Sequence, residues 1–171
     1  MDDKPGWTRL DWPGPEDPDF FGYVRQWEED RLFDEAEWSL VALTSGETYE
    51  RRGTQFKATF TGFTAGELQG ALLSHTHVRG LPPSGPDIVL LLELPQLSQF
   101  RVARKAKQTI VLRRQKGIGR IEAALLLREV HLRVTQRGAL SAEDVEIALI
   151  FWLELQTELG ELGIEWLEEE P

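Results

Sequence analysis

The sequence contains no cysteine. Disulfide frameworks, thiolate zinc sites and cysteine nucleophiles are therefore excluded, and any metal must rest on histidine, aspartate and glutamate. No apolar run approaches the roughly 18 residues of a membrane span, and the acidic N-terminus has no signal-peptide core, so we expect a cytoplasmic protein with no membrane partner. Only three of the 171 residues are histidine, and two of these, His75 and His77, are separated by a single residue.

Several catalytic motifs are also missing. Gly117-Ile118-Gly119 lacks the third glycine of a dinucleotide fingerprint, and no glycine-rich loop ends in Lys-Ser or Lys-Thr. No serine lies in a G-x-S-x-G elbow. Hydride transfer, phosphoryl transfer and serine hydrolysis are therefore not the leading hypotheses.

Charge is unevenly distributed along this net-acidic chain of charge −10. Residues 101–137 hold 11 basic and 2 acidic side chains, whereas residues 138–171 hold 10 acidic and no basic ones. The favoured interpretation is that the acidic segment folds over the basic one and neutralises it. Nucleic-acid binding through residues 101–137 is the weaker alternative.

The hydrophobic pattern predicts an α/β fold, in which a mixed β-sheet is flanked by α-helices. Residues 1–19, rich in proline and glycine, are expected to form an irregular arm, and residues 20–171 a single domain. Helices are predicted at about 20–37, at a capping box over 64–67, and at 88–94, 121–133 and 141–160. Strands are predicted at 38–43, 47–52, 56–60, 71–77, 99–104, 108–114 and 164–167.

Two histidines at the end of the 71–77 strand form the most informative pattern. Residues two apart on a strand project from the same face, so His75 and His77 can converge on one ion. Asp87 follows a loop rich in proline and glycine, at the start of the next helix, from which it can approach the strand end. Two imidazoles and one carboxylate suit zinc and leave a fourth position for water. The alternative is that Ser84 and Asp87 form only a helix capping box.

The segment from Ser74 to Asp87, Ser-His-Thr-His-Val-Arg-Gly-Leu-Pro-Pro-Ser-Gly-Pro-Asp, resembles the signature of the JAMM/MPN (JAB) metalloproteases. That signature is H-x-H-P followed by a short loop and S-x-x-D, and the resemblance extends to its RadC-like branch. It implies a JAMM-like domain with cytidine-deaminase-like layering, a motif core over 37–114 and a C-terminal helical extension over 120–171. It also implies a catalytic zinc on His75, His77 and Asp87, with Ser84 stabilising the tetrahedral intermediate.

The family also uses an upstream glutamate that handles the proton, at the start of a strand of pattern E-x-x-G-L-x-L-G. Glu37, followed by Trp-Ser-Leu-Val-Ala-Leu, resembles this layout best. Glu47 and Glu50, on the following hairpin arm, are the alternative general bases. His131, within a predicted helix, is interpreted as a helix-face residue rather than a ligand.

Two departures from the signature bear on function. Val78 stands where the family has proline, and six residues separate His77 from Ser84, a spacing similar to JAMM-like domains of phage and prophage head-morphogenesis proteins. The resemblance implies a zinc-dependent peptidase or isopeptidase acting on a protein or peptide substrate. The first alternative is a non-catalytic JAMM-like interaction or scaffold module associated with phage or mobile elements. The second is a RadC-like protein associated with nucleic acid.

Overall fold

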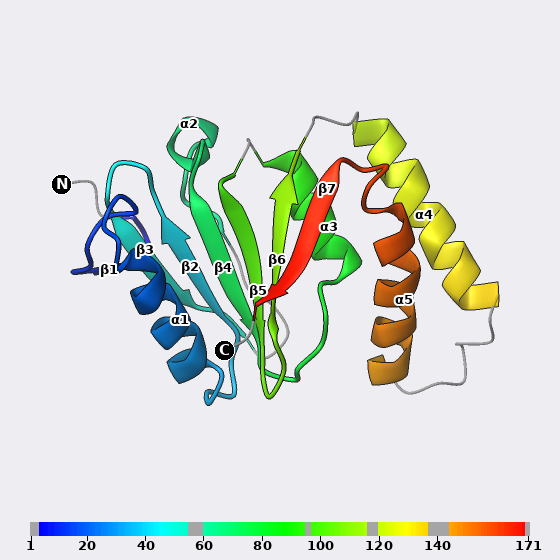
Figure 1. Ribbon diagram of the computed structural model, residues 1–171, viewed down its shortest axis with the longest axis horizontal. Helices are drawn as coiled ribbons and strands as arrows, with labels where there is room; N and C mark the ends of the chain where they lie inside the picture. The colour runs from blue at the N-terminus through cyan, green and yellow to red at the C-terminus, as the bar shows by residue number, and fades with distance from the viewer. Residues whose placement is uncertain (1–3, 55–59, 95–96, 116–119, 137–143, 170–171) are drawn as a thin grey trace.

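One mixed β-sheet organises the structure (Figure 1). The computed structural model describes residues 4–54, 60–94, 97–115, 120–136 and 144–169. These ranges contain the strands β1 (Thr8–Leu10), β2 (Trp38–Ala42), β3 (Thr48–Arg52), β4 (Leu72–His77), β5 (Gln99–Arg104), β6 (Thr109–Arg114) and β7 (Ile164–Glu169). Their order is β1-β3-β2-β4-β5-β6-β7, and every neighbouring pair is antiparallel except β4 with β5. The α/β class and the mixed sheet predicted from the sequence are confirmed.

Helices cover both faces of this sheet. They are α1 (Phe20–Arg31), α2 (Ala65–Leu68), α3 (Gly85–Glu93), α4 (Arg120–Gln136) and α5 (Asp144–Glu158). On one face, Phe20 of α1 shares a core cluster with Leu40 and Leu72. On the other face, Leu73 and Phe100 share the larger cluster with residues of α3, α4 and α5. Because β4 lies in the middle of the sheet with both faces covered, all six of its residues are buried.

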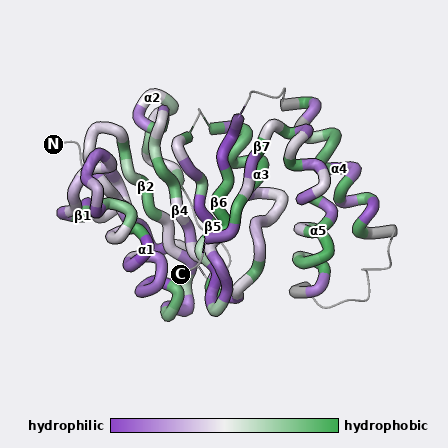
Figure 2. The backbone as a smooth tube through the Cα atoms, in the orientation of Figure 1, coloured by the Kyte–Doolittle hydropathy of each residue, from purple (hydrophilic) through white to green (hydrophobic). Residues whose placement is uncertain are grey.

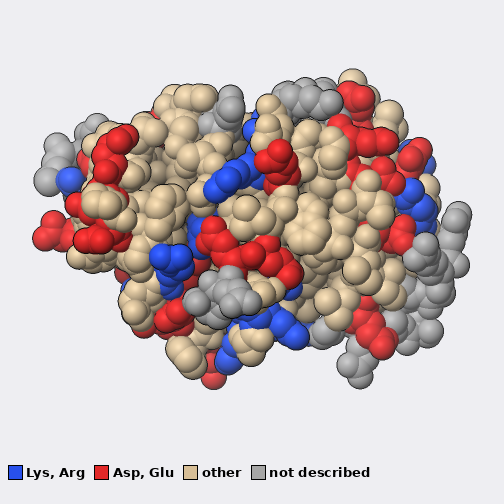
Figure 3. Space-filling model, viewed as in Figure 1, with Lys and Arg blue, Asp and Glu red and all other residues tan. Residues whose placement is uncertain are grey.

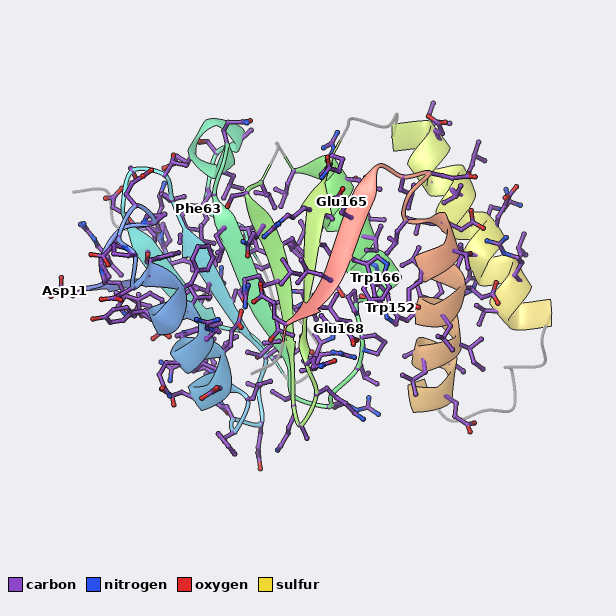
Figure 4. The ribbon with its side chains drawn as sticks, in the orientation of Figure 1. Asp11, Phe63, Trp152, Glu165, Trp166 and Glu168 are labelled. Carbon is purple, nitrogen blue, oxygen red and sulfur yellow. The ribbon has the colours of Figure 1, made fainter. Side chains whose placement is uncertain are left out.

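α4 and α5 pack against each other, and both contribute residues to the larger core cluster beside the sheet (Figure 1). Trp152 of α5 packs edge-on against Trp166 of β7, with ring centroids 5.6 Å apart (Figure 4). α5 is predominantly hydrophobic, in contrast to the more hydrophilic α1 (Figure 2). Among the described helices, none is both long and apolar enough to cross a membrane.

The first helix is shorter than the sequence pattern predicts. It ends at Arg31 rather than near residue 37. The Asp34 carboxylate accepts hydrogen bonds from the backbone N–H groups of Glu35 and Ala36, which offers the backbone an alternative to the helix. Phe33, which fitted the helical spacing, is 82% exposed. The prediction of a helix up to residue 37 was therefore wrong after Arg31, where hydrogen bonds to the Asp34 side chain replace those of a helix.

The N-terminal arm also contains regular structure. Residues 1–19 are expected from their composition to be irregular, whereas Thr8–Leu10 form β1 and pair with β3 at the sheet edge. The predicted capping box over 64–67, the β5–β6 hairpin and the last edge strand are confirmed. Most of the predicted strand at 56–60 and the start of the helix predicted at 141–160 lie outside the described residues.

The basic stretch is neutralised in part within the chain. Arg101 is 1% exposed, and its guanidinium binds Glu28 of α1 at 2.7 Å and Glu169 of β7 at 2.8 Å. Arg104 binds Glu168 of β7 at 3.0 Å. On the face drawn in Figure 3, acidic and basic side chains are interspersed. These contacts favour the interpretation that the acidic C-terminal segment folds over residues 101–137.

Candidate metal centre

The centre begins at the carboxyl end of β4. β4 lies between β2 and β5, which bury it on both edges. Because side chains alternate along a strand, His75 and His77 both project from the face that α3, α4 and α5 cover. Their Nε2 atoms lie 2.9 Å apart. After His77 the chain leaves the sheet, forms α3 and returns as β5 (Figure 1). Both imidazoles lie beside the first turn of α3, which carries Asp87.

Asp87 reaches the two histidines from the first turn of α3. Its Oδ1 lies 3.1 Å from His75 Nε2, and its Oδ2 lies 3.6 Å from His77 Nε2. Ser84 is the N-cap residue, and both halves of the capping box are formed. The backbone N–H and the hydroxyl of Ser84 donate to Asp87 Oδ2 at 2.6 and 2.7 Å. The capping box is therefore compatible with a metal-ligand role for Asp87, since the capped carboxylate lies against the histidines.

The donor atoms have spacings that suit a metal ion. Two ligand atoms on a tetrahedral zinc ion, each about 2.0–2.1 Å from the metal, lie about 3.3 Å apart. The three measured separations of 2.9, 3.1 and 3.6 Å bracket that value. Within the described part of the chain, His75, His77 and Asp87 form the cluster of ligating side chains that could hold a metal ion.

Neighbouring groups hold the two rings in different ways. His77 Nδ1 donates to the carbonyl oxygen of Leu81 at 2.8 Å, which leaves the lone pair of this imidazole on Nε2. The ring of His75 packs against Phe60 and Phe100, at centroid distances of 6.0 and 5.3 Å. Its Nδ1 is buried and has no hydrogen-bond partner among the described residues. His75 is thus oriented by aromatic packing, and His77 by a backbone carbonyl.

The protonation states also suit a ligand set. Burial, and secondarily the proximity of His75, lowers the pKa of His77 from 6.5 to about 4, so its imidazole is neutral at pH 7. Burial alone would raise the pKa of the Asp87 carboxyl. The two histidines and the Ser84 backbone N–H outweigh that effect and hold the pKa of Asp87 well below its usual range. A neutral imidazole and an ionised carboxylate are the forms that bind metals.

Glu37 lies on the same side of the sheet as the triad formed by His75, His77 and Asp87. Ser39 of β2 pairs with His75 of β4, and continuing this antiparallel register by two residues puts Glu37 opposite His77. The side chain is partly buried and lines the same cavity as the two histidines. Its backbone N–H donates to Thr54 at 2.9 Å, which fixes the chain just before β2.

The two alternative glutamates lie elsewhere. Glu50 pairs with Leu40, whose side chain belongs to the α1 face, so Glu50 projects from the face opposite the histidines. There its carboxylate accepts a hydrogen bond from Trp27 Nε1 at 2.8 Å and binds Arg31 at 2.8 Å. Glu47 lies in the β2–β3 turn, where Ser45 donates to it at 2.9 Å. Of the three glutamates considered, the structure brings only Glu37 to the cavity that the triad lines.

A cavity of about 560 Å³ adjoins the triad. This volume lies within the range of about 300–1,000 Å³ typical of ligand sites. One wall is the loop from β4 into α3, and the opposite wall is formed by α4 and α5. Besides the triad and Glu37, the lining consists of Phe60, Arg79, residues 81–86, Leu90, His131, Val134, Ile147, Ala148 and Phe151.

The sequence pattern does not reveal that the C-terminal helices contribute to the cavity. His131 was interpreted as a helix-face residue, and it is indeed outside the ligand cluster, but it lines the cavity. No local pattern places α4 and α5 over the triad, because their packing depends on contacts distant in sequence. Arg79 was also missed, although its position two residues after His77 could have suggested it.

No family model, no curated protein and no solved structure matches this chain. The function is therefore inferred from the residues of the site and their geometry.

Proposed function

We propose that the chain is a zinc-dependent peptidase or isopeptidase acting at the centre formed by His75, His77 and Asp87. The observation that supports this most is the convergence of two imidazoles and a carboxylate within 3.6 Å of one another, beside a cavity that Glu37 also lines. Two nitrogen ligands and one oxygen ligand from the protein, with a position left open, are typical of catalytic zinc sites. The resemblance to the JAMM signature points to the same chemistry.

The three ligand residues would hold the ion, which supplies Lewis acidity and makes water a nucleophile near pH 7. Glu37 acts as the general base and acid. It accepts the proton released when an O–H bond of water breaks and a C–O bond forms at the amide carbon, and it returns that proton to the leaving nitrogen as the C–N bond breaks. Its position on the same sheet face as both histidines supports this role.

Ser84 has two proposed roles: it positions Asp87, and it stabilises the oxyanion. Its hydroxyl donates to Asp87 Oδ2 and thereby positions the carboxylate. To stabilise a developing oxyanion, the hydroxyl must turn away from Asp87 and donate to the substrate oxygen instead. The Ser84 backbone N–H, which donates to Asp87 Oδ2 at 2.6 Å, would keep the carboxylate in place during that change.

Glu37→Gln is expected to slow hydrolysis by at least about 100-fold while leaving zinc affinity unchanged, since an amide cannot accept the proton. The measurement is cleavage of a mixture of unstructured peptides by the zinc-loaded full chain, followed by mass spectrometry. Glu47→Gln is the matched control, because Glu47 does not line the cavity. Wild-type rates for Glu37→Gln would contradict the role of Glu37. A zinc-loaded wild type that cleaves no peptide would contradict the proposed activity.

The second candidate function is a JAMM-like interaction module without turnover. Exposed leucine and isoleucine side chains on α4 and α5 favour it: Ile121 and Leu153 are 78% and 61% exposed. Under this alternative, the wild-type chain would bind zinc at His75, His77 and Asp87, and Glu37→Gln would change no measured property.

A further inference from the structure

An unpaired cation lies at the cavity beside the triad. Arg79 is exposed and lines the cavity, and no hydrogen bond or ion pair joins its guanidinium to another described residue. It is the only lysine or arginine among the described residues that line this cavity. Arg101, Arg104 and Arg133, by contrast, all bind carboxylates within the chain. Arg79 is therefore available to a ligand.

The turn that carries Arg79 is fixed to the metal centre. The Gly80 N–H donates to the His77 carbonyl oxygen at 2.8 Å, and the Lys105 N–H donates to the same oxygen at 3.3 Å. Gly80 has φ +70°, and a Cβ at this position would lie 2.9 Å from the Lys105 carbonyl oxygen. Only glycine satisfies both conditions without strain. Arg79 is thus presented at a defined place, two residues after a ligand residue.

The remainder of the cavity wall is largely apolar. Leu90 of α3, Val134 of α4 and Phe151 of α5 contribute to it. The Phe151 ring closes over the start of α3, since a Cβ on Gly85 would lie 3.5 Å from its Cζ. An apolar pocket with one guanidinium suits a ligand that has an apolar body and one anionic group. The rigid fork of arginine matches a carboxylate in two-point contact.

We propose that Arg79 binds the free C-terminal carboxylate of a peptide substrate, whose last side chain is apolar and occupies this cavity. The inference rests on the proposed peptidase function and narrows it to removal of a C-terminal residue. Only Val78 separates Arg79 from His77, so the two Cα atoms lie at most about 7 Å apart, which suits a carboxylate one residue beyond the scissile amide. Water adds to that amide carbon, the C–N bond breaks, and the leaving nitrogen takes the proton and departs as a free amino acid.

Binding to the metal-free full chain tests Arg79 without any catalysis. The probes are acetyl-Ala-Ala-Leu and its C-terminal amide, and the readout is the dissociation constant from NMR titration. We expect the wild type to bind the carboxylate form about 10- to 100-fold more tightly. Arg79→Gln should lose this preference. The matched control is Arg113→Gln. Leu112 of β6 packs in the core on the α3 side of the sheet, so its neighbour Arg113 projects from the opposite face, where it is exposed. Equal binding of both peptides by the wild type, or a preference that survives in Arg79→Gln, would overturn the inference.

Hydrolysis by the zinc-loaded chain separates the inference from the function on which it rests. The carboxylate peptide should be cleaved with a kcat/KM about 10-fold or more above that of the amide, and Arg79→Gln should remove the difference mainly by raising KM. If both peptides are cleaved equally and Arg79→Gln changes nothing, the inference fails and the peptidase function stands. If neither peptide is cleaved but the binding preference depends on Arg79, the carboxylate site stands and the peptidase function fails.

Discussion

His75→Ala is expected to weaken zinc binding by more than about 100-fold and to abolish hydrolysis. Loss of even an indirect partner of a metal ligand typically costs 10- to 100-fold in affinity, and His75 is itself one of the three proposed ligands. Its Nε2 lies 2.9 Å from His77 Nε2 and 3.1 Å from Asp87 Oδ1, and the cluster contains no fourth residue among those described. The measurement is a competition titration against a chromophoric chelator, with circular dichroism to verify the fold.

His131→Ala is the matched control, because His131 lines the cavity but lies outside the ligand cluster. It should retain one tightly bound zinc per chain. Asp87→Asn distinguishes the helix-capping role of Asp87 from its proposed role as a metal ligand. The amide oxygen can still accept a hydrogen bond from the Ser84 N–H, but the negative charge is lost. This variant should keep the stability of α3 and lose zinc affinity. Wild-type affinity in His75→Ala would show that the ion binds elsewhere.

Glu28→Ala is expected to lower the free energy of unfolding by about 3–5 kcal/mol, the typical cost of removing one partner of a buried ion pair. Glu28 and Arg101 are 3% and 1% exposed, and the two form a two-point contact at 2.7 and 3.0 Å. Ser74 also donates to Glu28 at 2.7 Å, so the truncation leaves a buried hydroxyl without its acceptor. The measurement is urea unfolding at pH 7, with m-values compared to establish that the transition remains two-state.

Two further variants distinguish the pair from its surroundings. The double variant Glu28→Leu with Arg101→Met should recover most of the stability, because it removes both buried charges together and Glu169, the other partner of Arg101, is 29% exposed to water. Arg52→Ala breaks an exposed pair with Asp34, in which the arginine side chain is 57% exposed, and should cost about 1 kcal/mol or less. A Glu28→Ala variant as stable as Arg52→Ala would contradict the structural role of this buried pair.

The clustering of His75, His77 and Asp87 was predictable because each part of it depends on local structure. Alternation along one strand is sufficient to put His75 and His77 on one face. A capping box fixes Asp87 at the third position of α3, and the short loop brings that helix end close to the strand end. The signals that identified these residues therefore involve no segment outside residues 71–94.

The remaining parts of the site depend on contacts between distant segments. Glu37, Glu47 and Glu50 all precede or follow the same strand, and only the β2–β3–β4 register shows that Glu50 faces α1 and Glu37 faces the triad. The cavity wall formed by α4 and α5 depends on core packing with residues such as Phe100, far away in sequence. Sequence periodicity identifies such helices but does not determine where they pack.

Anomalous diffraction at the zinc edge, from crystals of the full chain grown with one equivalent of zinc, tests the central claim most directly. The structure predicts one strong peak within bonding distance of His75 Nε2, His77 Nε2 and the Asp87 carboxylate. A zinc-bound crystal with its only peak at another group of residues, or a chain that binds no zinc in solution at pH 7, would contradict it.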